Sequence, residues 1–134
     1  MENLERSRSW LPNTRRPISP AHHAMLDYGV AATFLTMAAR YASRGHRPAA
    51  GLALLNGAMV LGMSLLTDYP GGVAKRLSFK THRTGDIVQA ALSGVGPWLF
   101  GFGDDPEASF FRGQALSEAG VIAATDWNAA PQHG

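Results

Sequence analysis

The sequence predicts an all-α protein of four transmembrane helices, arranged as two tandemly duplicated helical hairpins. One observation behind this prediction is a polar signature that returns about 59 positions later. Its two copies are Ile18-Ser19-x-x-x-His23-x-x-x-Asp27 and Leu77-Ser78-x-x-x-His82-x-x-x-Asp86. The other is the clustering of charge in short segments that leave long apolar stretches between them, a pattern typical of membrane proteins.

A second pair of marks closes each repeat, because Thr67-Asp68-Tyr69 returns as Thr125-Asp126-Trp127. We therefore divide the chain into a basic N-terminal arm, two helical-hairpin repeats and a short C-terminal tail. The ranges are 1–17 for the irregular arm, 18–76 and 77–127 for the repeats, and 128–134 for the tail.

The first repeat is expected to hold two helices. Ser19 and Pro20 form an N-cap and first-turn signal, which predicts a helix from about Pro20 to Ala42. Gly45 and Pro48 mark the turn that follows. The stretch 49–66 is the clearest membrane span, because its eighteen residues are interrupted only by Asn56 and Ser64 and would be about 27 Å long as a helix.

The second repeat is expected to follow the same plan. Ser78 takes the part of Ser19, and a helix from about 79 to 102 should be kinked at Pro97. Asp104, Asp105 and Pro106 predict the start of a fourth helix that reaches about 126. This is the weakest candidate span, because Glu118 lies near its middle and must face protein rather than lipid.

The basic residues predict the orientation, with both termini in the cytoplasm and the protein integral to the cell (inner) membrane. The arm and the central loop carry Arg6, Arg8, Arg15, Arg16, Lys75, Arg76, Lys80 and Arg83, against Arg40, Arg44, Arg47 and Arg112 on the other side. A net charge of +2 is too small to favour nucleic acid. The expected partners are the lipid bilayer and either other membrane protein subunits or further copies of this chain.

The repeated His/Asp pairs are the candidate site. Within each helix a spacing of four puts both side chains on one face, and the topology brings Asp68 and Asp126 to the same level. One hypothesis is a metal site of His23, Asp27, His82 and Asp86, a haem or chlorophyll-type cofactor on His23 or His82, or a proton relay. The alternative is structural, with Asp68, Asp126, Asn56 and Glu118 as polar ties between helices; Glu118 would find Asn56 or Gln89.

The chain resembles the SPW-repeat family of small bacterial and archaeal membrane proteins, through the Thr-Asp-Tyr mark, the His/Asp helix starts and the segment 96–102. Pro97-Trp98 with Gly101 is the most specific part. Gly96 replaces the Ser of that motif, and Ala38-Ala39 stand where the first repeat would carry Pro-Trp. The resemblance implies a membrane location and a four-helix form and assigns no activity.

No catalytic motif is recognisable, and the absence of cysteine excludes disulfides and thiolate metal sites. We therefore expect a non-enzymatic integral membrane protein, a structural or accessory subunit of a larger membrane assembly. The alternative is a membrane module that binds a metal or a haem- or chlorophyll-type cofactor, or conducts protons, through the repeated His/Asp pairs; the sequence identifies no particular cofactor.

Overall fold

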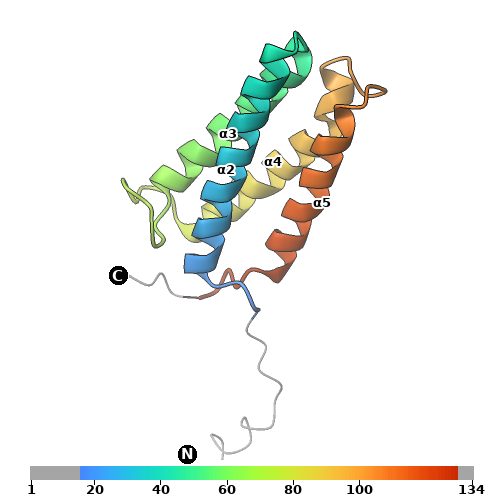
Figure 1. Ribbon diagram of the computed structural model, residues 1–134. Coiled ribbons are helices and arrows are strands. Elements are labelled where there is room, and N and C mark those ends of the chain that lie inside the picture. Colours follow the sequence, from blue (N-terminus) through green and yellow to red (C-terminus); the bar gives the residue numbers. More distant parts are fainter. Residues whose placement is uncertain (1–15, 130–134) are drawn as a thin grey trace, which may run out of the picture.

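The computed structural model describes residues 16–129, which form a bundle of four helices without a strand (Figure 1). The helices are α2 (Pro20–Ser43), α3 (Arg47–Leu66), α4 (Phe79–Leu99) and α5 (Ala108–Ala124). Helices α2 and α3 make one hairpin and α4 and α5 the other, so the predicted all-α architecture of two hairpins is confirmed. Most of the predicted arm (1–15) and tail (130–134) lie outside the described residues.

The two hairpins begin in the same way. Ser19 has an extended backbone and its hydroxyl accepts the N–H of His22, and Ser78 does the same for the N–H of Thr81. Both serines therefore cap the first turn of their helix, as the sequence predicts. Pro20 occupies the first helical position of α2, where its missing N–H costs no hydrogen bond.

The far ends of the hairpins differ from the sequence prediction. Helix α4 ends at Leu99 and not near 102, so Pro97 lies in its last turn. Helix α5 begins at Ala108 rather than near Asp104, and its N-cap residue makes no side-chain cap. Asp105 instead contacts His46, with 3.1 Å between its Oδ2 and the imidazole Nε2. The expected cap residue therefore ties two loops together.

The two repeats close on each other through backbone hydrogen bonds. The N–H of Ile18 donates to Ala124 O at 3.1 Å, and the N–H of Asp126 donates to Ile18 O at 2.8 Å. The equivalent Leu77 donates to Leu66 O at 2.8 Å. The strand-like segment before each first helix thus pairs with the end of a second helix, which holds both His/Asp helices at one end of the bundle.

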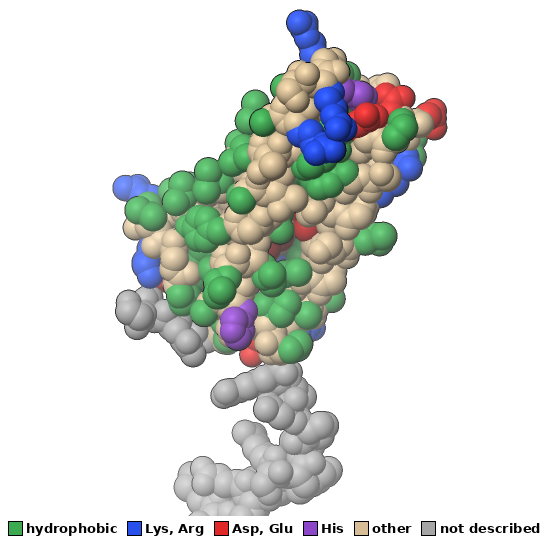
Figure 2. Space-filling model, viewed as in Figure 1, with side chains coloured by type: hydrophobic (Ala, Val, Ile, Leu, Met, Phe, Trp, Pro, Cys, Tyr) green, Lys and Arg blue, Asp and Glu red, His purple; other side chains and the backbone are tan. Residues whose placement is uncertain are grey.

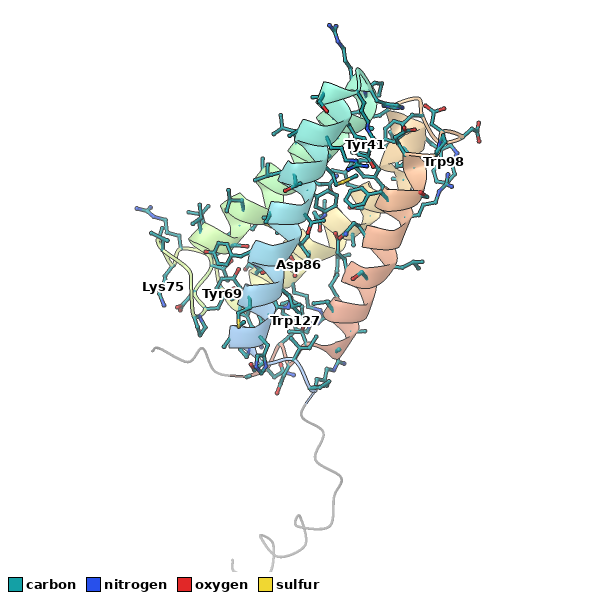
Figure 3. All side chains as sticks on the ribbon, viewed as in Figure 1. Tyr41, Tyr69, Lys75, Asp86, Trp98 and Trp127 are labelled. Atoms are coloured by element: carbon teal, nitrogen blue, oxygen red, sulfur yellow. The ribbon has the colours of Figure 1, made fainter. Side chains whose placement is uncertain are left out.

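The interior is divided along its length. Aromatic and aliphatic side chains fill the end near the α2–α3 and α4–α5 turns, where Phe34, Tyr41, Leu52, Phe102 and Phe111 are buried together. Polar and ionisable side chains fill the other end and the middle, among them His23, Asp27, Asn56, His82, Asp86, Gln89 and Glu118. Figure 3 shows the labelled Tyr69, Asp86 and Trp127 at the polar end, opposite Tyr41 and Trp98.

The outer surface along the helices is mostly apolar and uncharged, whereas the interior holds polar and ionisable side chains. In the ranges 24–39, 48–67, 84–103 and 113–125, no exposed residue is Asp, Glu, Lys or Arg. Leu54, Val88, Val95 and Leu116 are among the large apolar side chains exposed there, and Figure 2 shows apolar side chains gathered between charged ends. We call these four ranges the uncharged belt. By length and composition, α3 is the one described helix that could cross a membrane.

Candidate metal centre

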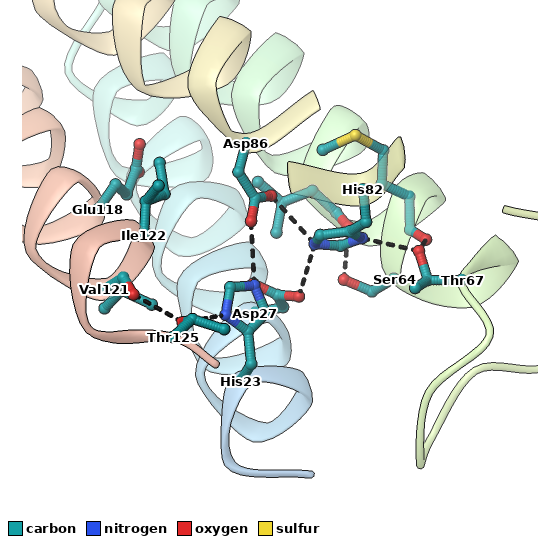
Figure 4. A network of polar contacts seen from close by, with 12 residues as sticks. His23, Asp27, Ser64, Thr67, His82, Asp86, Glu118, Val121, Ile122 and Thr125 are labelled. Carbon is teal, nitrogen blue, oxygen red and sulfur yellow. Dashed lines mark hydrogen bonds and ion pairs between the residues drawn. The ribbon is translucent and has the colours of Figure 1, made fainter. Parts of the chain in front are cut away.

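Two histidines and two aspartates from both hairpins form a closed ring (Figure 4). His23 Nε2 lies 3.3 Å from Asp27 Oδ1 and 3.0 Å from Asp86 Oδ2. His82 Nε2 lies 3.0 Å from Asp27 Oδ2 and 3.0 Å from Asp86 Oδ1. Each carboxylate thus contacts both imidazoles, one with each oxygen. The structure brings together the four residues that the sequence predicted as a metal site, here called the His/Asp ring.

The ring is enclosed by the bundle. Both histidines are 1% exposed and both aspartates 7% exposed. One ligand atom from each of the four residues lies within 4.8 Å of the others. Two imidazole nitrogens and two carboxylate oxygens are a donor set that zinc and related divalent ions accept. Ligand atoms about 2.1 Å from a common tetrahedral ion are about 3.4 Å apart, close to the observed contacts.

Two threonines fix the orientation of the imidazoles. Thr125 Oγ1 donates to Val121 O at 2.6 Å, so its remaining contact, 2.8 Å to His23 Nδ1, must be one in which it accepts. Thr67 repeats this arrangement, donating to Met63 O at 2.6 Å and accepting from His82 Nδ1 at 2.7 Å. Each Nδ1 therefore carries hydrogen and points to its threonine, which leaves the Nε2 of each ring facing the carboxylates; His23 Nε2 is within hydrogen-bond distance of Asp86 Oδ2 at 3.0 Å.

The charge of the ring must be balanced. With two neutral imidazoles the ring carries the charge of two carboxylates, which is costly in a buried site. A divalent ion bound by both Nε2 atoms would neutralise it, and so would a proton on each Nε2. His82 Nε2 has two carboxylate oxygens at 3.0 Å but no hydrogen bond of acceptable direction among the described residues. His23 Nε2, in contrast, makes a hydrogen bond with Asp86 Oδ2 at 3.0 Å.

Two aromatic side chains cover the His/Asp ring. Tyr69 is buried and its hydroxyl donates to Asp27 Oδ2 at 2.9 Å. Burial and the neighbouring carboxylate of Asp27 raise the pKa of Tyr69. Trp127, its counterpart in the second repeat, packs on His23 with 4.8 Å between ring centroids. Both aromatic residues of the Thr-Asp-aromatic marks are thus buried against the site.

The two aspartates next to those aromatic residues stay outside the ring. Asp68 Oδ1 lies 4.0 Å from Lys75 Nζ, and Asp126 Oδ1 accepts the N–H of Asn128 at 3.2 Å. Asp68 and Asp126 lie at the same end of the bundle as the ring, but only Asp27 and Asp86 contact the histidines. Each Thr-Asp-aromatic mark instead places its threonine against a histidine. The repetition of Thr67 and Thr125 was the available signal for these partners.

A second polar group lies deeper in the bundle. Gln89 Nε2 has three acceptors for its two hydrogens: Asn56 Oδ1 at 2.9 Å, Ser93 Oγ at 3.1 Å and Glu118 Oε1 at 3.1 Å. Glu118 is 8% exposed and its Oε2 has no hydrogen-bond partner within residues 16–129. The predicted tie between Glu118 and Gln89 is present, and Asn56 joins through Gln89. A cavity of about 70 Å³ lies beside Glu118 and reaches the His/Asp ring.

In a second cluster of possible ligands the histidine carries its hydrogen on the other ring nitrogen, so this nitrogen cannot bind a metal ion. His46, Asp105 and Glu107 approach each other at the opposite end of the bundle. His46 Nδ1 accepts the N–H of Ala49 at 3.2 Å as the cap of α3. Its hydrogen is therefore on Nε2, which donates to Asp105 Oδ2 at 3.1 Å. We assign this cluster to the connection between the two loops.

The chain matches no protein-family model, and no match was found among curated proteins or among solved structures. The resemblance to the SPW-repeat family gains no support from these comparisons.

Proposed function

We propose that the protein is a membrane-embedded four-helix module that binds one divalent transition metal, of the zinc class, in the His/Asp ring. The observation that carries this proposal is the pair of threonines, Thr67 and Thr125, that hold both Nδ1 atoms as donors. A partner on the second ring nitrogen is the usual companion of a metal-bound histidine, because it fixes the tautomer and the ring plane.

The ligands come from both hairpins, so a bound ion would join them. His23 and Asp27 lie on α2, while His82 and Asp86 lie on α4. A tetrahedral set of four protein ligands is typical of structural zinc sites. The proposed role is therefore non-enzymatic. A haem or chlorophyll-type cofactor is less well supported, because both Nε2 atoms face carboxylates at 3.0 Å and the adjoining cavity measures only about 70 Å³.

The metal content of the purified full chain tests this proposal. After incubation with Zn²⁺ and removal of free ion, elemental analysis should give one zinc per wild-type chain and much less for His82→Ala. His46→Ala is the matched control, because His46 also contacts carboxylates but uses Nδ1 as an acceptor. Equal zinc in wild type and in a helical, correctly sized His82→Ala variant would overturn the proposal.

The membrane part of the proposal rests on the uncharged belt. Charged side chains in a lipid interior are costly, and buried ones face protein. The exposed positions of all four helices lack charge over the belt, while Asp27, Asp86 and Glu118 point inward. We propose four spans, including α2, α4 and α5, in the cell (inner) membrane with both termini cytoplasmic. Retention in the pellet after an alkaline carbonate wash is expected; release into the supernatant would contradict it.

A second candidate function is a structural or accessory subunit of a larger membrane assembly. It is favoured by a patch of large apolar side chains at the end of α4, where Trp98, Leu99 and Phe100 are exposed. Mild detergent extraction followed by native separation and mass spectrometry should show a partner at fixed stoichiometry. A particle that contains only this chain would contradict the accessory role.

A further inference from the structure

A basic pocket lies at the end of the bundle where α4 begins. Its volume is about 470 Å³, within the usual range for small-molecule sites. The residues that line it include Arg16, Lys80, Arg83, Thr84, Asp126 and Trp127. The pocket is separate from the His/Asp ring and plays no part in the proposed metal site.

The charge in the pocket is unbalanced. It contains three cationic side chains and one carboxylate, Asp126. Within residues 16–129, Lys80 and Arg83 make no ion pair. The guanidinium of Arg83 lies 6.0 Å from the centroid of the Trp127 ring, a contact that leaves its N–H donors available. The pocket therefore offers cationic donors to an anion.

The fold does not require these cations. Lys80 and Arg83 occupy positions that are Ala21 and Ala24 in the first repeat. Ala24 is buried, and the loop after α3 packs close to it, since the Tyr28 hydroxyl donates to Gly71 O at 2.6 Å. The second repeat therefore has two cationic side chains in its pocket at positions where the first repeat has alanine. Duplication of the hairpin alone does not account for it.

The position of the pocket identifies the kind of anion. Ile87 also lines it, and Ile87 and Val88 are 49% and 55% exposed on the next turn of α4, inside the uncharged belt. An amphiphile placed here would have its charged group at Lys80 and Arg83 and its apolar part along α4. A free phosphate would use only the first half of this surface.

We propose that this pocket binds the phosphate of an anionic phospholipid, with an acyl chain along Ile87 and Val88. The inference rests on the proposed membrane location and is independent of the metal site. Basic pockets at the cytoplasmic ends of membrane helices attract anionic head groups, and each Lys or Arg near the surface contributes measurably. The pocket lies on the side that the distribution of basic residues predicts to be cytoplasmic.

Lipid retention by the delipidated full chain tests the proposal. The protein in mild detergent is given equal amounts of phosphatidylglycerol and phosphatidylcholine, and bound lipid is counted by native mass spectrometry. We expect phosphatidylglycerol to be preferred, and the double variant Lys80→Ala/Arg83→Ala to bind it roughly tenfold more weakly. Lys75→Ala/Arg76→Ala is the control, because it removes the same charge from the neighbouring loop and should change binding little.

Three results would overturn the proposal. Equal retention of both lipids would remove the charge selectivity, and an equal loss in the control variant would assign the effect to diffuse charge. Competition by sn-glycerol 3-phosphate as strong as that of phosphatidylglycerol would identify a site for a free phosphate ester. Release of the protein by alkaline carbonate is a distinct result, because it would contradict the membrane location itself.

Discussion

His23 of the first repeat lies closer to Asp86 of the second repeat than to Asp27 on its own helix. The Nε2–Oδ2 distance to Asp86 is 3.0 Å, whereas the Nε2–Oδ1 distance to Asp27 is 3.3 Å. The His-x-x-x-Asp spacing therefore does more than bring one pair together on a helix face. Because each carboxylate contacts both imidazoles, the ring joins the two hairpins.

Removal of one carboxylate should destabilise the whole bundle. Asp86→Asn keeps the size of the side chain but removes a carboxylate that both histidines contact. Whether the ring is balanced by protons on Nε2 or by a bound metal ion, this change leaves positive charge uncompensated in a buried site, which costs about 3–5 kcal/mol. Asp104→Asn is the matched control, because Asp104 is exposed in the α4–α5 connection. Denaturant unfolding of the purified proteins measures both. A loss for Asp86→Asn no greater than for Asp104→Asn would show that the ring is not a stabilising contact.

The threonines should control metal affinity without being ligands. Thr125→Val removes the acceptor of the His23 Nδ1 hydrogen, and Thr67→Val does the same for His82. Loss of such a partner typically weakens metal binding about 10–100-fold. We expect this weakening in Zn²⁺ titrations of both valine variants, and near wild-type affinity in Thr125→Ser and Thr67→Ser, which keep the hydroxyl. Unchanged affinity in the valine variants would contradict the role of the threonines.

The contribution of Tyr69 to stability should decrease as the pH rises above about 10. Its pKa is raised in the folded protein, whereas an unfolded tyrosine ionises near pH 10. Stability from the neutral hydroxyl is therefore complete below about pH 10 and is lost as the pH rises toward the folded pKa. Tyr69→Phe should be less stable than wild type near pH 8, and the difference should narrow above about pH 10. A difference that grows with pH would contradict this sign.

The helices and the four residues of the His/Asp ring could be predicted from the sequence. Helix starts depend on local residues, and the His/Asp pairs occur twice. Ser19 and Ser78 indicate where the helices start, and the spacing of four between His and Asp places both members of each pair on one helix face. Convergence of the two pairs followed from the topology of a duplicated hairpin. No periodicity could have revealed which oxygen contacts which imidazole.

The roles that we predicted wrongly belong to residues whose contacts are set by tertiary packing. Within each Thr-Asp-aromatic mark, we expected Asp68 and Asp126 to be polar ties between helices and named neither threonine as a site residue, yet it is the threonines that contact the histidines. Asp105 looked like a helix cap, but the loop around His46 offered it a partner from another hairpin. Such long-range contacts override local capping signals because the tertiary fold brings them together.

Comparison of the two repeats predicts how much Glu118 contributes to stability. Its counterpart in the first repeat is Val60, which is 3% exposed and lines the same cavity. The bundle therefore accepts an apolar side chain at this position, and Gln89 keeps Asn56 and Ser93 as partners without Glu118. We expect Glu118→Val to change the free energy of unfolding by no more than about 1 kcal/mol, because the lost hydrogen bond is offset by the removal of a buried carboxylate oxygen without a partner.

The reciprocal substitution should behave differently. Val60→Glu adds a fourth buried carboxylate to those of Asp27, Asp86 and Glu118 around the same cavity, where an unpaired charge costs several kcal/mol. Denaturant unfolding of Glu118→Val and Val60→Glu, compared with wild type, separates the two positions. A loss of about 3 kcal/mol or more in Glu118→Val would mean that the carboxylate itself holds the polar group together. The asymmetry between the repeats would then be a requirement of folding and not a feature added to an inherited scaffold.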